Sequence, residues 1–294
     1  MNDLQITKGQ RIFSFFNTIF MLLLITITLY PVLYGLFSSI SDPCKLMQHQ
    51  GILLWPQGFS LDAYKAVIQK PEILTGYANT IFYVVVGTSL NVMMTAFMAY
   101  GLSRSYLRYT KPIMLMVMVT MFFYGGMIPS YLLVRNLGLL NTRWAILLPT
   151  MISTYNLIVM KTSFMSIPIS LEEAARIDGA SDIKIFFSVI MPLSKSIFAV
   201  MILFYGVEIW NSWFNAMLYL KDRDMYPLQL FLREILVQNE TSDMMGGSGM
   251  ENQAKIQETV KYATVVVATI PILCIYPMIQ KHFVTGVMIG AVKG

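Results

Sequence analysis

Polar side chains that could bind a hydroxyl-rich ligand recur at helical spacing in an otherwise apolar stretch. Glu208, Asn211 and Asn215 stand at positions i, i+3 and i+7, so a helix would place them on one face. Their carboxylate and amides can hydrogen-bond hydroxyl groups, and the neighbouring Trp213 offers a flat apolar surface. Aromatic residues at helical spacing are more often packing residues or membrane-interface anchors. The pattern therefore predicts a ligand path, with a packing role as the alternative for each aromatic residue.

Two further residues are weaker candidates for the same path. Tyr155 and Asn156 lie in a separate apolar segment, where an asparagine can equally hold two helices together. Glu208 also bears on ligand charge, because an unpaired carboxylate in the path would repel an anion. This favours a neutral ligand, unless the carboxyl group is protonated or is paired within a partner subunit.

The sequence lacks the groups that covalent or nucleotide chemistry would need. A phosphate-binding loop requires a Gly-Lys pair, and no such pair occurs in the chain. His49 and His282 lie far apart in the sequence, and Cys44 and Cys274 lie in different environments. We therefore predict no enzymatic activity, no metal site and no cofactor bound by this chain.

The elements that must position these residues are membrane-length helices. Of the 294 residues, 56% are hydrophobic and only 13% are charged, far from the composition of a soluble domain. A helix needs about 20 apolar residues to cross the hydrocarbon core, and lipid offers the backbone no hydrogen bonds. The sequence predicts a single all-α integral membrane domain over 1–294 with six transmembrane helices, at about 12–40, 75–103, 112–134, 144–160, 196–220 and 262–280.

A polar segment at 170–192 interrupts the apolar pattern and predicts a helical hairpin. Ser170 and Glu173 have the spacing of a capping box, which would start the first helix. Gly179 follows one short helix later, where a left-handed C-cap costs little only for glycine. Ser181 then provides an N-cap for the second helix. An ordinary loop helix would carry the same caps.

Two stretches between the predicted spans can be described only coarsely. Residues 42–72 hold several Pro and Gly residues and predict a folded loop with a short helix near 61–69. In 225–238, Leu228, Phe231 and Ile235 share one helical face, which predicts a helix lying along the membrane surface.

The pattern around the hairpin resembles the EAA signature of ATP-binding-cassette (ABC) importer permeases. That signature has E-A-A, a glycine after three residues, and an aliphatic residue before Leu-Pro; here it falls on Glu173, Ala174, Ala175, Gly179, Val189 and Pro192, with Met191 replacing the usual leucine. The resemblance implies that the hairpin is a cytoplasmic coupling helix docked on an ATPase. The contact residues it implies are Glu172, Glu173, Ala174, Ala175, Asp178, Gly179 and Ala180.

The resemblance extends over most of the chain. The runs Met127–Pro149, Trp210–Leu220 and Gly286–Gly294 are similar to carbohydrate-uptake permeases of the maltose-transporter type, in the branch that serves oligosaccharides and polysaccharide fragments. It implies an importer subunit that works by alternating access and receives sugar from an extracytoplasmic binding protein. It also implies that Gly290, Lys293 and Gly294 contact the ATPase, although a frayed terminus would look the same.

The resemblance further implies the partners and the orientation. The expected partners are a second homologous permease subunit, two ATPase subunits that hold ATP and Mg, the binding protein and membrane lipid. A hairpin that meets an ATPase must face the cytoplasm, which places both termini inside a bacterial cytoplasmic (inner) membrane. The net charge of +5 then reflects bases near anionic lipid and needs no nucleic acid. An ion-coupled secondary transporter or a channel subunit is the alternative, although the matched halves typical of such transporters are not visible.

Overall fold

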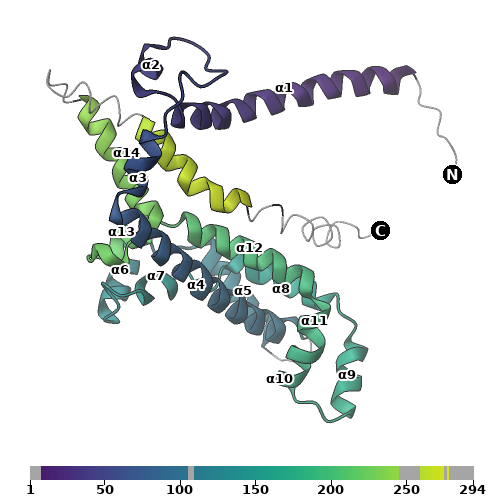
Figure 1. The fold of residues 1–294 in the computed structure, drawn as a ribbon. Coiled ribbons are helices and arrows are strands. Elements are labelled where there is room, and N and C mark those ends of the chain that lie inside the picture. Colours follow the sequence, from purple (N-terminus) through teal and green to yellow (C-terminus); the bar gives the residue numbers. More distant parts are fainter. Residues whose placement is uncertain (1–7, 105–108, 245–258, 275–276, 278–294) are drawn as a thin grey trace. The chain divides into compact units, whose positions relative to one another are not determined.

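The computed structural model describes residues 8–104, 109–244, 259–274 and 277, and within them every regular element is a helix (Figure 1). The chain divides into two compact units. The first comprises 1–70 with 235–269, and the second comprises 71–234 with 270–294. The all-α class predicted from the sequence is confirmed for the described part of the chain.

The first unit contains the long helix α1 (Lys8–Ser39), the short helices α2 (Pro43–Gln48) and α3 (Asp62–Ile68), and part of the apolar helix Thr259–Cys274. The Oδ1 atom of Asp42 caps α2 by accepting hydrogen bonds from two backbone N–H groups. Ser39 at the end of α1 shares a 2.7 Å hydrogen bond with the Tyr64 hydroxyl of α3. The loop helix expected near 61–69 is confirmed.

The second unit is built around α4 (Pro71–Ser103), which packs along α8 (Thr154–Met165) and α12 (Lys195–Asn211) (Figure 1). Ala96 and Ala99 of α4 are fully buried, and small residues at such positions let helix backbones approach closely. A 2.7 Å hydrogen bond joins the buried hydroxyls of Thr95 on α4 and Tyr205 on α12. The three helices therefore form one core with a polar tie inside it.

Three predicted spans are not continuous helices. The range 112–134 is divided into α5 (Thr110–Phe122) and α6 (Met127–Asn136), which meet at 117°. Gly126 between them has φ +88, which a residue with a side chain rarely adopts. The range 144–160 is divided into α7 (Trp144–Leu147) and α8, and Pro149, which has no N–H to donate, stands in the gap.

The third division lies in the range 196–220. Helix α12 ends at Asn211, and the short helix α13 (Phe214–Tyr219) follows after Ser212 adopts an extended conformation. A search for charge-free stretches could not reveal these breaks, because no charged residue lies at any of them.

The number of membrane crossings stays a prediction. In the described residues, α1 and α4 alone are long and apolar enough to span a bilayer, and two bent pairs could each form one further span. One pair is α5 with α6, and the other is 182–193 with α12, bent by 86°. Residues 262–274 of the predicted span at 262–280 belong to a shorter apolar helix, Thr259–Cys274, and 275–276 and 278–280 lie outside the described residues.

The remaining elements are short, apart from α14 (Leu228–Met244). A hairpin of α9 (Ile169–Ile177) and α10 (Asp182–Ile185) leads through the π-helix Phe186–Ile190 into α11 (Met191–Leu193), and the 3-10 turn Arg223–Met225 precedes α14. Leu228, Phe231 and Ile235 are all buried, as expected of a shared apolar face, whereas the location of this helix along the membrane surface stays a prediction.

Candidate functional site

The hairpin at α9 and α10 lies at one end of the second unit, beyond the ends of α8 and α11 (Figure 1). Gly179 makes the turn with φ +78, as the sequence predicts. Ser181 caps α10 by accepting a hydrogen bond from the Lys184 N–H at 3.4 Å. Arg176 of α9 pairs with Asp182 of α10 at 2.6 Å, so the two arms are tied across the turn.

The predicted capping box is wrong. Helix α9 begins at Ile169 rather than after Ser170, and its N-cap is Pro168, which makes no side-chain cap hydrogen bond. Pro168, with φ −58 and ψ 128, sets the entry into the helix. Ser170 therefore lies inside the first turn, where its hydroxyl is not in the capping position.

The outer face of the hairpin is open to solvent or a partner. Glu173, Ala174, Asp178 and Gly179 are exposed, whereas Ala175 and Ala180 are half-buried and pack against the core. Exposed aliphatic side chains accompany them, with Ile177 87% and Ile183 70% exposed. Small and apolar residues gathered at an exposed turn form a surface suited to contact with another protein.

Glu172 differs from the other residues expected to contact the ATPase because it points inward. The resemblance implies an accessible side chain on the hairpin surface, and this expectation is wrong, since Glu172 is only 3% exposed. Its Oε1 atom forms an ion pair with Arg104, which is equally buried just after α4. Its Oε2 atom accepts a 3.4 Å hydrogen bond from the Tyr100 hydroxyl. The acidic residue directly before the E-A-A motif therefore interacts with the interior of the protein.

The polar residues predicted to share one face of the fifth span do not share a helix. Glu208 and Asn211 are exposed near the end of α12, whereas the half-buried Asn215 lies on α13, beyond the break at Ser212. The Asn211 amide donates to the Val207 carbonyl of its own helix. The expected i, i+3, i+7 face is wrong for Asn215, because the extended backbone at Ser212 ends the helical register.

The aromatic residues near this break have different partners. Trp213 lies under the Arg233 guanidinium, 4.2 Å from the ring centroid, and makes an edge contact with Phe214. Trp210 is buried against the Tyr77 ring of α4, which is a packing role. Non-helical backbone at membrane depth occurs where protein covers it or where it lines a water-filled cavity. The break near Trp213 therefore stays the best candidate for a polar path.

The two residues predicted on the fourth span lie at the start of α8. Tyr155 is 55% exposed, and its ring lies 6.3 Å from that of Phe204 on α12. Asn156 is 3% exposed and belongs to the interior. Tyr155 is thus accessible to a ligand on the α12 side, whereas Asn156 fits the helix-packing alternative.

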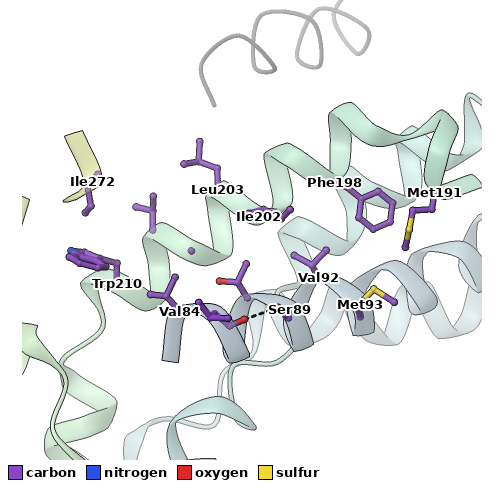
Figure 2. A pocket seen from close by; sticks show the side chains of 14 residues that line it. Val84, Ser89, Val92, Met93, Met191, Phe198, Ile202, Leu203, Trp210 and Ile272 are labelled. Atoms are coloured by element: carbon purple, nitrogen blue, oxygen red, sulfur yellow. Dashed lines mark hydrogen bonds between the residues drawn. The ribbon is translucent and has the colours of Figure 1, made fainter. Parts of the chain in front are cut away.

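A cavity of about 530 Å³ lies between α4 and α12 (Figure 2). Aliphatic and aromatic side chains line most of it, including Val92, Phe198 and Trp210. The Ser89 hydroxyl at its wall donates to the Val85 carbonyl at 2.7 Å, so it is already occupied. The cavity includes none of the polar path candidates, and its lining does not match the hydroxyl groups of a sugar.

At the opposite end of the second unit, a polar network fixes residues 224–228 to α4. The Asn79 amide donates to the carbonyls of Asp224 and Tyr226, and the Tyr83 hydroxyl donates to the Met225 carbonyl at 2.8 Å. The Leu228 N–H donates to the Thr80 hydroxyl at 2.8 Å. This end of α4 is therefore bound to the segment that follows the α12–α13 break.

Sequence reasoning missed the buried partners of both regions. Asn79, Thr80 and Tyr100 lie in the predicted span 75–103, and Arg104 follows it directly, where the sequence names no partner for any of them. Polar residues inside an apolar span were a usable signal, because they need partners there. The C-terminal residues Gly290, Lys293 and Gly294 lie outside the described residues.

Comparison with known families accounts for the motif and the helical architecture together. The family of binding-protein-dependent transport system inner membrane components matches residues 97–289, a range that includes the whole hairpin. The chain belongs to this family. It is thus a transporter permease and not an enzyme.

Known members of this permease family match nearly the full chain. Protein LplC of Bacillus subtilis is 41% identical over 288 residues, covering 98% of this chain and 97% of its own length. The polygalacturonan/rhamnogalacturonan transport system permease protein YtcP of the same organism is 41% identical over 290 residues, covering 97% and 99%.

A solved structure is similar to this chain in both fold and sequence. The crystal structure of a bacterial ABC transporter involved in the import of the acidic polysaccharide alginate contains a chain that matches with a TM-score of 0.86 and 34% identity. The match covers 94% of this chain and 98% of that one. The arrangement of helices described above is therefore that of an importer permease.

Proposed function

We propose that this chain is one permease subunit of an ATP-driven importer that carries oligosaccharides or polysaccharide fragments across the bacterial cytoplasmic membrane. The observation that carries the proposal is the nearly full-length similarity, at 41% identity, to a permease named for polygalacturonan and rhamnogalacturonan transport. The hairpin with its exposed small and apolar residues supports it, because an importer permease must present a surface to its motor.

The proposed complex contains this chain, a second homologous permease subunit, two ATPase subunits and an extracytoplasmic binding protein. ATP and Mg belong to the ATPases. Glu173, Ala174, Ala175, Asp178, Gly179 and Ala180 would form the ATPase-facing surface, with the C-terminal residues beside it. We further propose six spans with both termini in the cytoplasm. Closure of the ATPases would move the hairpin and switch the path between outward and inward openings.

The proposed path runs beside the α12–α13 break. Glu208 and Asn211 offer exposed polar groups there, and Trp213 offers an aromatic face that the Arg233 guanidinium partly covers. Sugars bind to such combinations of hydrogen-bonding groups and flat apolar surfaces. Arg233 adds a positive charge close to the path, so the carboxylate of Glu208 does not by itself restrict the substrate to neutral sugars.

Co-purification and reconstitution test the proposal. The tagged chain, expressed with its neighbouring genes, is expected to isolate an ATPase pair and a second permease. Proteoliposomes with the binding protein are expected to take up sugar only when ATP is supplied. Uptake driven by an ion gradient without ATP would support a secondary transporter, and passive conduction by the lone chain would support a channel.

Parallel uptake assays distinguish acidic from neutral oligosaccharides as substrates. Oligogalacturonides represent the acidic class, and arabino-oligosaccharides of matched length represent the neutral class. Uptake of either establishes the importer, and the ratio of the two rates assigns the charge preference. If neither is taken up although ATP is hydrolysed, the oligosaccharide assignment is wrong.

A further inference from the structure

The buried pair of Arg104 and Glu172 lies where three helices meet. Arg104 follows the last residue of α4, and its Nη1 atom donates to the carbonyl of Phe164 in the last turn of α8 at 3.3 Å. Glu172 lies in the first turn of α9. A cation near two helix C-termini and an anion at a helix N-terminus both match the helix dipoles. The pair therefore closes a junction in which each charge is favourably placed.

Aromatic residues also pack around this junction, on the side that faces the second arm of the hairpin. The Tyr100 ring lies 5.0 Å from the Arg104 guanidinium carbon and 5.5 Å from the ring of Phe186. Phe186, which follows α10, is 1% exposed, and its ring also lies 4.9 Å from that of Phe97. The end of α4 thus holds both arms of the hairpin, one through charge and the other through aromatic packing.

Helix α4 connects this junction to the opposite end of the unit. Its 33 residues form one uninterrupted helix, about 50 Å long at 1.5 Å per residue. Asn79, Thr80 and Tyr83 near its start hold residues 224–228, as described above. A displacement of the hairpin would therefore reach the segment after the α12–α13 break along a single rigid element.

We propose that Arg104 and Glu172 are positioning residues that make α9 and α4 move as one body, so that hairpin motion is converted into reorientation of the path. The proposal rests on the proposed importer function. Under this proposal the acidic residue directly before the E-A-A motif acts through the permease interior, not through contact with the ATPase. A directional guanidinium–carboxylate pair resists sliding between helices in a way that apolar packing alone does not.

The first test measures the sugar taken up per ATP hydrolysed by the complete transporter in proteoliposomes. Glu172→Gln and Arg104→Gln are expected to lower this ratio about tenfold, within the usual range of coupling between distant sites, while the ATPases still co-purify. Arg104→Lys keeps the charge and is expected to retain an intermediate ratio. Lys65→Gln, which breaks an ion pair whose side chains are 70% and 69% exposed, is the matched control and should change nothing.

A double variant separates positioning from stability. Arg104→Met with Glu172→Met removes both charges but keeps apolar volume, a change that often preserves or raises stability. We expect this variant to assemble and to hydrolyse ATP with the ratio still low. If its ratio equals that of the wild type, the pair has only a structural role and the inference is wrong.

A distance measurement on the otherwise unaltered complex covers the case in which the single variants do not assemble. Spin labels at Gly101→Cys on α4 and Ile177→Cys on α9 report the separation of the two helices, in a background with Cys44→Ser and Cys274→Ser. The distance is expected to be the same without nucleotide and with ATP. A shift between the two states would overturn the inference. A wild-type complex that binds no ATPase and transports nothing would instead contradict the proposed function.

Discussion

Glu172 on α9 and Glu208 on α12 are both carboxylates, yet the fold gives them opposite surroundings. Glu172 is 3% exposed and is held by Arg104 and Tyr100. Glu208 is exposed near the end of α12, and no cation lies within ion-pair distance of it in the part of the chain that the structure describes. The first carboxylate is paired with a cation inside the protein, whereas the second is available for a ligand or a partner subunit.

The difference separates two tasks that a permease needs. A joint that transmits force requires fixed geometry, which burial and multiple contacts provide. A path that passes many sugar molecules requires accessible polar groups that bind each of them weakly. Substitutions at the Arg104–Glu172 pair should therefore affect stability and coupling together. Substitutions near the α12–α13 break should affect transport with little effect on stability.

The largest effect on stability is expected from Arg104→Met. It leaves the Glu172 carboxylate buried without its cation, and losing one partner of a buried pair costs about 3–5 kcal/mol. Thermal unfolding of the purified complex in detergent measures the loss. Lys65→Met in the exposed pair is the control and should leave the unfolding temperature unchanged. Equal effects of the two variants would show that burial of the Arg104–Glu172 pair has no energetic consequence.

The next effect is expected at the hairpin turn. Gly179→Val forces a β-branched residue into φ +78, a conformation that costs about 1–3 kcal/mol outside glycine. We expect uptake to fall strongly while the ATPases still co-purify, because the strain falls on the exposed turn. Gly101→Ala is the control, since its backbone is helical and a Cβ there would meet no atom within 4 Å. Normal transport by Gly179→Val would contradict the coupling role of the hairpin.

The hairpin turn and the buried Arg104–Glu172 pair also show what the sequence could predict and what it could not. Gly179 and Ser181 act locally, so their turn and cap followed from residue type alone. The membrane class followed from composition in the same way. Glu172 depends on Arg104, 68 positions away, and no local pattern states that the two side chains meet. The break at Ser212 was missed for a different reason, because no charged residue, Gly or Pro stands at 211–214 and tertiary packing decides where the helix ends.

The glycines at the two ends of α4, Gly76 and Gly101, differ in how closely they are packed. A Cβ on Gly76 would lie 2.9 Å from the Phe231 ring and 3.1 Å from the Leu228 backbone, so the backbone of α14 would have to move. Overpacking of this kind costs about 1–3 kcal/mol. Gly76→Ala is expected to lower the unfolding temperature and to loosen the 224–228 segment, measured by hydrogen exchange at Leu228. Gly101→Ala at the other end of α4 should do neither.

Glu208→Gln is expected to have the smallest effect on stability. It therefore separates the role in substrate passage most clearly from the role in coupling. The side chain is exposed and unpaired in the described residues, and such surface substitutions usually change stability by less than about 0.5 kcal/mol. Sugar uptake should nevertheless change, and the ratio of acidic to neutral oligosaccharide uptake should rise, because a negative charge beside the path is removed. The measurement is competitive uptake of the two sugar classes, with Asn211→Asp as the matched variant that adds a charge one turn away and should shift the ratio in the opposite direction. If both variants leave the ratio and the total uptake at wild-type values, the path does not pass the end of α12, and Glu208 has no more part in substrate selection than Glu172.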